Sequence, residues 1–222
     1  MSTLNNLIGQ FTNPSEAEGL FLSIEGIEGS GKTTQINFIK QFFEDKGYTV
    51  ITLREPGGTR FGEKLREAIL ESTSPLHPLS EAHLFVSSRT QLLFEKILPA
   101  LKDKKTVVIL DRYIDSSLAY QGKARGLGFE TILKLHLNSP LNILPVRTYF
   151  LDIDLETSMQ RQALRGNKKD YFESEKKDFY LSLVEGYREV ASLFTERVKR
   201  IDATVSAQEV SELIKADLEA LL

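Results

Sequence analysis

A glycine-rich segment near the N-terminus has the residue types and the spacing of a phosphate-binding loop. Residues 26–33 match the pattern G-x-x-x-x-G-K-[ST], between an apolar run and a helical pattern, as such a loop requires. Backbone N–H groups of the loop and the N-terminus of the next helix can hold phosphate oxygens. Lys32 can bridge the β- and γ-phosphates of a nucleotide, while the Thr33 hydroxyl can bind Mg²⁺. The residues expected at the nucleotide are Gly26, Ile27, Glu28, Gly29, Ser30, Gly31, Lys32, Thr33 and Thr34.

Three charged side chains, Glu28, Asp111 and Arg112, could also contact a bound nucleotide or its metal ion. Asp111 and Arg112 follow an apolar run at 106–110, and α/β folds bind ligands at the carboxyl ends of such strands. Asp111 can support Mg²⁺, and Arg112 can clamp a second phosphate, unless the two form a surface pair that caps the next helix. Glu28 would repel phosphate unless it binds a sugar hydroxyl or a water on Mg²⁺, or points into solvent.

The elements that must position these residues follow from the alternation of apolar and amphipathic stretches. Strands are expected at 20–25, 48–53, 106–110, 146–152 and 199–202, and the clearest helices at 80–101, 176–197 and 206–222. This alternation predicts one α/β domain, residues 20–222. Together with the glycine-rich loop, it indicates a three-layer sandwich of the P-loop NTPase type. In it, helices flank a five-stranded parallel sheet. Residues 1–19 are predicted to be an N-terminal extension with a short helix on the surface.

Composition excludes several classes of protein. The 222 residues carry 28 Lys and Arg against 31 Asp and Glu, a net charge of −3, which argues against a nucleic-acid or membrane-surface protein. There is no Cys, so disulfides and thiol chemistry are excluded. No apolar run approaches the ~18 residues of a membrane span. The first basic residue is Lys32, so no targeting signal is recognised and a cytoplasmic protein is expected.

Together, these motifs resemble those of the bacterial thymidylate kinases. Besides the glycine-rich loop, the resemblance rests on four blocks: Arg-Glu-Pro-Gly-Gly-Thr at 54–59, Leu-Phe-x-x-x-Arg at 84–89, the segment 111–122 that begins Asp-Arg-Tyr, and Ile-Asp-Ala-Thr at 201–204. It covers residues 20–222. The resemblance implies a homodimer that transfers the γ-phosphoryl group of MgATP to dTMP, which gives dTDP and ADP.

The resemblance also implies individual roles. Phe85 would stack on the base and Arg89 would donate to its edge, and their spacing of four residues puts both on one helical face. An ordinary core Phe is the alternative for Phe85. Glu28 would meet the deoxyribose 3′-hydroxyl and Arg112 the acceptor phosphate. The other residues implied for dTMP are Arg54, Pro56, Leu65, Ser117, Tyr120 and Gln121.

A densely charged segment at about 161–178 resembles the mobile lid of the family, although such a pattern alone would be a solvated helix face. The glycine-rich loop contains no Arg, so positive charge for the transferring phosphoryl must come from elsewhere. Arg165 is the predicted catalytic lid residue. Arg161 is expected to contact ATP, and Glu173 to assist Mg²⁺.

Two other functions remain open from the residues alone. A deoxynucleoside kinase would need a general base at its acceptor hydroxyl, a role that Glu28 could fill. A non-enzymatic, ATP-dependent switch could bind a partner through residues 80–101. A GTPase is rejected, because Asn-Lys-Lys-Asp at 167–170 follows a helical stretch and not a buried strand. The histidines, His77, His83 and His136, have no metal-binding spacing and are expected to be packed or exposed.

Overall fold

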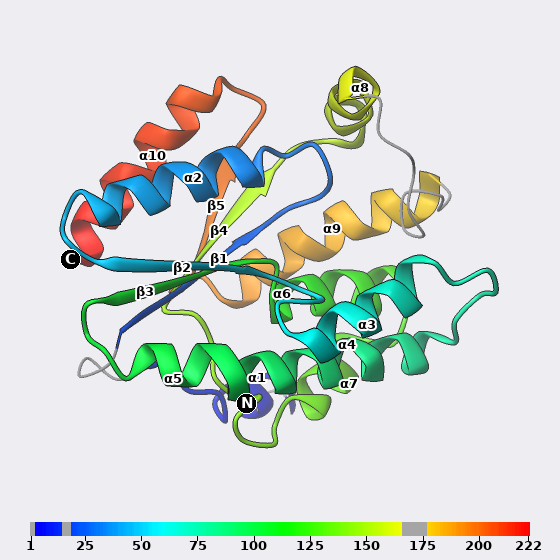
Figure 1. The fold of residues 1–222 in the computed structure, drawn as a ribbon. Coiled ribbons are helices and arrows are strands. Elements are labelled where there is room, and N and C mark those ends of the chain that lie inside the picture. Colours follow the sequence, from blue (N-terminus) through cyan, green and yellow to red (C-terminus); the bar gives the residue numbers. More distant parts are fainter. Residues whose placement is uncertain (1–2, 15–18, 166–176) are drawn as a thin grey trace.

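A five-stranded parallel sheet forms the centre of the molecule (Figure 1). The structure is a computed structural model and describes residues 3–14, 19–165 (the Arg165 side chain excepted) and 177–222. The strand order is β2-β3-β1-β4-β5. The strands are β1 (Leu20–Glu25), β2 (Thr49–Arg54), β3 (Thr106–Asp111), β4 (Arg147–Asp152) and β5 (Val198–Asp202). Each lies within one residue of its predicted bounds, so the expected α/β sandwich is confirmed.

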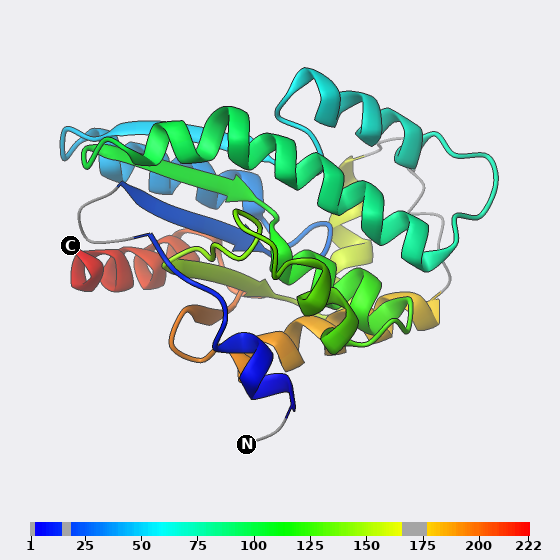
Figure 2. The same ribbon diagram turned by 90° about the horizontal axis from the view of Figure 1, so that it is seen from below.

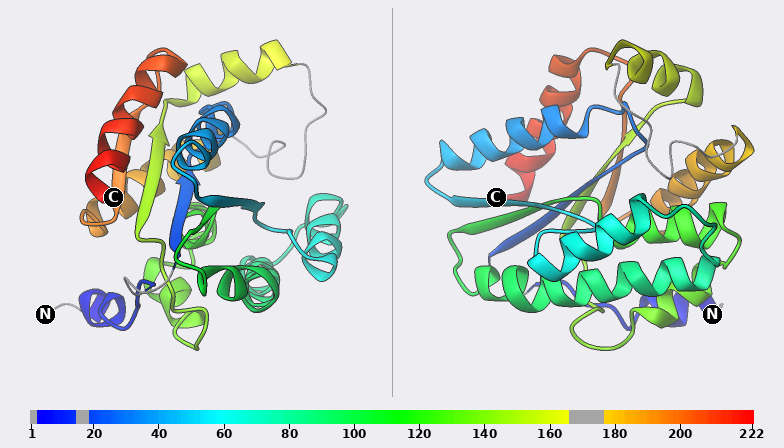
Figure 3. Two further views of the ribbon diagram at one scale, coloured as in Figure 1. Left: turned by 60° about the vertical axis from the view of Figure 1, so that its left-hand side comes forward. Right: turned by 45° about the vertical axis from the view of Figure 1, so that its right-hand side comes forward.

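Helices cover both faces of the sheet, as Figures 1 and 3 show. On one face lie α2 (Lys32–Glu44) and α10 (Ala207–Leu221), which contact each other. The elements on the other face include α4 (Pro78–Leu92), η1 (Leu93–Ile97), α5 (Leu98–Leu101), α6 (Ile114–Ser117), η2 (Leu118–Ala124) and α9 (Lys177–Leu193). The remaining helices are α1 (Thr3–Ile8), α3 (Arg60–Leu70), α7 (Phe129–Leu135) and α8 (Leu155–Arg165). Val107, Val108 and Ile109 of β3 are fully buried, as expected for a strand covered on both faces.

The carboxyl ends of the three strands at the centre of the site are level with one another. Asp111 pairs in register with Arg54 of β2 and with Ile24 of β1. The segments that leave these strands therefore start at one edge of the sheet, where open α/β sheets bind ligands. The glycine-rich loop follows β1, Glu55 follows β2 and Arg112 follows β3.

The helix predicted at 80–101 is one continuous rod whose hydrogen bonding changes along its length. α4 passes into the π-helical segment η1 and then into α5, which contains Pro99 near its start. Proline has no N–H and its ring crowds the carbonyl of the preceding turn, so a local change of helical pitch accommodates it. The rod therefore stays continuous across a residue that normally ends a helix.

The N-terminal segment packs against the domain. The helix α1 lies at the surface of the domain (Figure 2) and contacts α7. The side chain of Leu7 is buried. Beyond the helix, the Thr12 N–H donates to the Asn142 carbonyl at 2.9 Å, and the Leu144 N–H donates to the Thr12 carbonyl at 2.7 Å. The predicted short helix is thus present. Among the described residues, no helix is both long and apolar enough to span a membrane.

Candidate active site

The glycine-rich loop between β1 and α2 has the backbone shape that its glycines allow. Gly26 has φ 145°, a value that L side chains rarely adopt, and a Cβ there would lie 2.7 Å from the Leu151 carbonyl oxygen. Gly31, the residue before α2, is left-handed with φ 96°. The loop therefore lies close to β4 and enters α2 through a turn that favours glycine, which leaves N–H groups at the helix start for an anion.

Lys32 lies under this loop. Its ammonium donates to the carbonyls of Gly26 at 3.1 Å and of Ile27 at 3.4 Å, and the residue is 7% exposed. Burial, and secondarily the positive charge of Arg112, lowers the pKa of Lys32. A bound phosphate would oppose this shift, because an anion favours the charged ammonium.

Asp111 offers an oxygen for a metal ion. Its Oδ1 is buried and has no hydrogen-bond partner among the described residues, and Asp111 lines the same cavity as Thr33. A carboxylate and a hydroxyl are suitable ligands for Mg²⁺, which also takes water and phosphate oxygens. The described residues contain no group of three or more His, Cys, Asp or Glu that could hold a metal ion by themselves. Asp111 and Thr33 therefore fit an Mg²⁺ ion whose other ligands are water and the phosphate oxygens of a nucleotide.

Two adjacent cavities open at this edge of the sheet. The first, about 560 Å³, is called here the nucleoside cavity and is lined by Glu28, Glu55, Pro56, Arg66, Leu70, Phe85, Arg112, Ser116, Ser117, Tyr120, Gln121 and Tyr180. The second, about 580 Å³, is called the phosphate cavity and is lined by Glu28, Gly29, Gly31, Lys32, Thr33, Arg54, Glu55, Arg66, Asp111 and Arg112. The cavities share four charged residues: Glu28, Glu55, Arg66 and Arg112. A cavity with aromatic side chains thus adjoins one lined by the glycine-rich loop.

Arg112 is held at this shared boundary by its backbone and by its side-chain contacts. Its φ of 73° is in the left-handed region, a strained position for a residue other than glycine and one often found at functional sites. The guanidinium donates to the Tyr187 hydroxyl at 2.8 Å, and pairs with Glu28 at 3.0 Å. It also lies 5.3 Å from the centre of the Tyr120 ring. These contacts hold the planar guanidinium group at the boundary between the two cavities.

A buried carboxylate supports Arg112 from behind. Glu25, at the end of β1, accepts from the Tyr113 N–H at 2.7 Å and from the Ser116 hydroxyl at 2.6 Å. The Ser116 hydroxyl in turn shares a 2.7 Å hydrogen bond with the Tyr187 hydroxyl, which contacts Arg112. Burial, with a smaller contribution from Asp115, raises the pKa of Glu25 to about 8.

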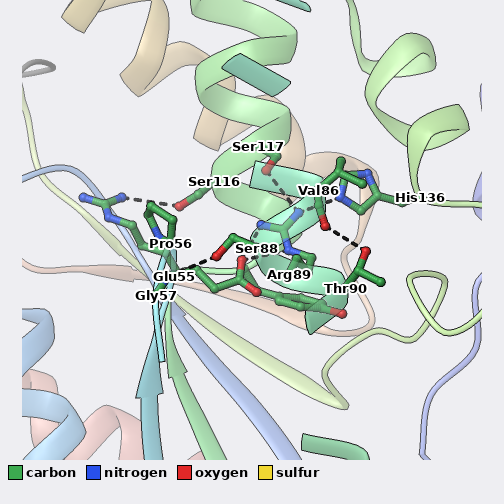
Figure 4. Close-up of polar contacts among 12 residues, drawn as sticks. Glu55, Pro56, Gly57, Val86, Ser88, Arg89, Thr90, Ser116, Ser117 and His136 are labelled. Atoms are coloured by element: carbon green, nitrogen blue, oxygen red, sulfur yellow. Dashed lines mark hydrogen bonds and ion pairs between the residues drawn. The ribbon is translucent and has the colours of Figure 1, made fainter. Parts of the chain in front are cut away.

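Arg89 lies in a buried cluster behind the nucleoside cavity (Figure 4). Its Nε and Nη2 donate to Glu55 Oε2 at 2.7 and 2.5 Å, and its Nη1 donates to the Ser117 hydroxyl at 3.1 Å. Nη1 also lies 2.6 Å from His136 Nε2. Described residues therefore occupy four of the five guanidinium N–H groups, and Arg89 lines neither cavity. One N–H group of Arg89 therefore remains for the contact with the base that the sequence predicts.

His136 is neutral in this cluster. Its Nδ1 is 2.7 Å from the Ile132 carbonyl, which can only accept, so Nδ1 carries the proton and Nε2 accepts from Arg89. Burial, with Arg89 as the second cause, lowers the pKa of His136 to about 3. The sequence left packing and exposure both open for this histidine; the structure shows it packed, and its neutral ring accepts a hydrogen bond from Arg89.

Comparison with known proteins identifies the family. The family model described as thymidylate kinase matches residues 24–214. The thymidylate kinase of Thermoanaerobacter sp. (strain X514) is 44% identical over 185 residues, which cover 83% of this chain and 90% of the relative. The chain belongs to the thymidylate kinase family. The thymidylate kinase of Caldanaerobacter subterraneus subsp. tengcongensis is 41% identical over 204 residues, 92% of this chain and 97% of that relative. The crystal structure of thymidylate kinase from Ehrlichia chaffeensis matches with a TM-score of 0.73 at 28% identity, and covers 90% of this chain and 98% of that chain.

Thymidylate kinases phosphorylate dTMP at the expense of ATP, so the predicted family and its kinase activity are confirmed. This membership decides against a non-enzymatic switch and against a deoxynucleoside kinase, which would phosphorylate a hydroxyl group.

The structure brings most of the residues implied for dTMP into one cavity. Pro56, Phe85, Ser117, Tyr120 and Gln121 all line the nucleoside cavity, and the peptide bond before Pro56 is cis. Glu28 and Arg112 lie at the boundary of the two cavities.

One of the residues implied for dTMP lies outside both cavities, and another lines the phosphate cavity alone. Leu65 lines neither cavity, and Leu70 of the same helix lines the nucleoside cavity instead. Arg66 and Leu70 are four residues apart and share one face of α3, whereas Leu65 is turned by about 100° from Arg66. Arg54 lines the phosphate cavity, where it pairs with Glu63 at 3.0 Å.

The residues predicted for ATP divide into backbone and side-chain roles. Ile27 is a core side chain, so only its backbone is available to phosphate, and Thr34 is exposed on α2 outside the phosphate cavity. Arg161 of α8 reaches the loop and donates to the Gly29 carbonyl at 3.3 Å. The side chain of Arg165 and the whole of Glu173 lie outside the described residues, as does most of the predicted lid.

Sequence reasoning missed several site residues of this family member. Arg66, Leu70 and Tyr180 line the nucleoside cavity, and Glu55 holds Arg89. The spacing of Arg66 and Leu70 on an amphipathic helix was the available signal, but it does not say which face meets the sheet edge. Tyr187 had no local signal, because its contact with Arg112 joins residues far apart in the chain.

Proposed function

We propose that this chain transfers the γ-phosphoryl group of ATP to dTMP at the boundary between the nucleoside and phosphate cavities. The observation that carries the proposal is that Glu28, Glu55, Arg66 and Arg112 line both cavities. The phosphate cavity, at the glycine-rich loop, suits the triphosphate of ATP, and the nucleoside cavity suits a base and sugar. A phosphate attached to a nucleoside in one cavity then meets the γ-phosphate held in the other, beside two guanidinium groups.

Within the nucleoside cavity, each side chain takes a role that suits its chemistry. Phe85 stacks on the thymine ring, with Pro56 and Leu70 as apolar walls. Ser117 and Gln121 face the edge of the base together with the remaining N–H of Arg89. Glu28 accepts from the deoxyribose 3′-hydroxyl, and Tyr120 lies beside the sugar.

The chemical step needs positioning and positive charge. Lys32 exchanges its loop carbonyls for β- and γ-phosphate oxygens, while Arg112 and Arg66 hold the acceptor phosphate in line for attack. No general base is required, because a phosphate monoester is already anionic near neutral pH. Lys32 and Arg112 are thus the proposed catalytic residues, together with Arg165 of the lid, and Arg161 is proposed to contact ATP.

We propose Mg²⁺ as the cofactor, held by Thr33 and Asp111, with Glu173 as an assisting residue. The unpartnered buried oxygen of Asp111 supports this assignment. When bound with ATP, Mg²⁺ neutralises charge on the phosphates. We further propose a cytoplasmic homodimer that binds neither nucleic acid nor membrane. Phe94, which is 70% exposed on the long rod, supports a partner at this helix.

The experiment that tests the function is a substrate panel. Purified protein is incubated with MgATP and with thymidine, dTMP, dUMP, dCMP, dAMP or dGMP, and ADP release is measured. The proposal predicts ADP release with dTMP and none above background with thymidine. Activity with thymidine and not with dTMP would contradict it.

A further inference from the structure

A buried ion pair lies beside the nucleoside cavity without lining it. Glu81 of α4 is 0% exposed, and its Oε2 lies 3.1 Å from Nη2 and 3.2 Å from Nε of Arg125, the residue that follows η2. Glu81 and Phe85 are four residues apart and share one face of α4, so the pair lies next to the proposed base-stacking ring. Neither member of the pair lines the nucleoside or the phosphate cavity.

The second oxygen of Glu81 contacts a cavity residue. Gln121 Nε2 donates to Glu81 Oε1 at 2.8 Å, and Gln121 lines the nucleoside cavity. A carboxylate paired with arginine can only accept hydrogen bonds, so the nitrogen of the Gln121 amide must face Glu81. The Oε1 of Gln121 is then turned away from Glu81, and none of the described residues donates a hydrogen bond to it.

We infer that Glu81 is a positioning residue that fixes the Gln121 amide with its oxygen toward the base and so selects a base that carries an N3–H. The inference deepens the proposed function and rests on the contact of Gln121 with the base. Thymine joined to a sugar through N1 has a single N–H, at N3, and an amide oxygen can accept from it. Cytosine presents a lone pair at N3 instead, which repels that oxygen.

Arg125 has a different part in this arrangement. It neutralises Glu81, with Nη2 3.1 Å from Oε2 and Nε 3.4 Å from Oε1, and lies 4.7 Å from the centre of the Phe179 ring, whereas the acceptor of the Gln121 amide nitrogen is Glu81 itself. Removing Arg125 therefore weakens the fold, because a buried carboxylate loses its cation, while Gln121 Nε2 still has its acceptor. Removing Glu81 takes away the acceptor itself.

The test compares four variants with the wild type: Glu81→Met, Arg125→Met, the double variant Glu81→Met/Arg125→Met, and Gln121→Met. The values of kcat/KM for dTMP, dUMP and dCMP are measured at saturating MgATP. dUMP serves as an internal control, because it carries the same N3–H as dTMP and lacks only the 5-methyl group. The double variant removes both charges together, and such replacements are often tolerated where a single one is not.

The inference predicts that Glu81→Met and the double variant lower the dTMP-to-dCMP ratio at least about tenfold, because the freed amide can turn its NH₂ toward cytosine N3. The dTMP-to-dUMP ratio stays unchanged in both. Arg125→Met keeps both ratios near the wild-type values, although its thermal stability falls. Gln121→Met lowers the dTMP-to-dCMP ratio as well.

Three results would overturn the inference. If Gln121→Met lowers the dTMP-to-dCMP ratio but the double variant keeps it, then Glu81 does not orient the amide. If Gln121→Met also keeps the ratio, the proposed contact of Gln121 with the base is wrong, and the inference fails with it. A loss of activity that is equal for all three substrates in the double variant counts against the inference, because it shows a merely structural role.

Discussion

Replacing Arg89 by methionine tests whether the buried cluster behind the nucleoside cavity is held together by charge. In the Arg89–Glu55 pair the side chains are 1% and 3% exposed, and Nη2 lies 2.5 Å from Oε2. Arg89→Met leaves the Glu55 carboxylate buried without its cation and takes the donor from Ser117 and His136. Breaking a buried pair from one side costs about 3–5 kcal/mol, and we expect Arg89→Met to lower the free energy of unfolding by that amount.

The measurement is urea unfolding followed by far-ultraviolet circular dichroism, with the free energy obtained by linear extrapolation. Glu55→Gln/Arg89→Met removes both charges, so we expect it to be more stable than Arg89→Met by at least about 1 kcal/mol. The matched control is Lys64→Met. Lys64 pairs with Glu67 at 2.7 Å, but the two side chains are 72% and 55% exposed, so no measurable change is expected. A loss below about 1 kcal/mol in Arg89→Met would refute the reasoning.

Three further predictions concern the residues around Arg112 and the metal site. Between pH 4.5 and about 8, Glu25 binds a proton in the folded protein but not in the unfolded chain, so the free energy of unfolding should fall as pH rises through this range. Urea unfolding at several pH values measures this slope, and Glu25→Gln should flatten it. An unchanged slope in Glu25→Gln would contradict the assignment. Tyr187→Phe removes a hydroxyl that accepts a hydrogen bond from Arg112 at 2.8 Å. The value of kcat/KM for dTMP should therefore fall roughly tenfold, while KM for ATP stays within about twofold. An equal effect on both substrates would count against a role of Tyr187 in holding Arg112. Asp111→Asn should raise the Mg²⁺ concentration for half-maximal activity, and an unchanged magnesium titration would remove Asp111 from the metal site.

The fold could be predicted from the sequence because its signals are local. β3 is almost entirely apolar, and the glycine-rich loop between β1 and α2 marks the carboxyl edge of the sheet. Once parallel strands are assumed, Asp111 and the loop must meet at that edge, and the register of β1 with β3 confirms it. The long rod was also found, but its change to π-helical hydrogen bonding before Pro99 was not, because periodicity alone does not distinguish the two pitches.

The site could be predicted only where a motif names the residue. Phe85 and Gln121 were assigned through the resemblance, and both line the nucleoside cavity. Side-chain contacts between residues that are distant in the sequence could not be predicted. The expectation for Arg89 was a hydrogen bond to the edge of the base, and it did not include the ion pair with Glu55. Tyr187 reaches Arg112 from α9, a contact that depends on how two helices pack against the sheet and not on either local pattern.

The most direct test of the central claim follows the transferred phosphoryl group itself. Protein is incubated with ATP labelled on the γ-phosphate, Mg²⁺ and dTMP, and the nucleotides are separated for wild type and for Arg112→Met. The account predicts labelled dTDP with the wild type. In Arg112→Met it predicts a loss of labelled dTDP with ATP binding retained, because the guanidinium at the boundary of the two cavities is gone. Labelled dTDP formed at the wild-type rate by Arg112→Met would contradict the account.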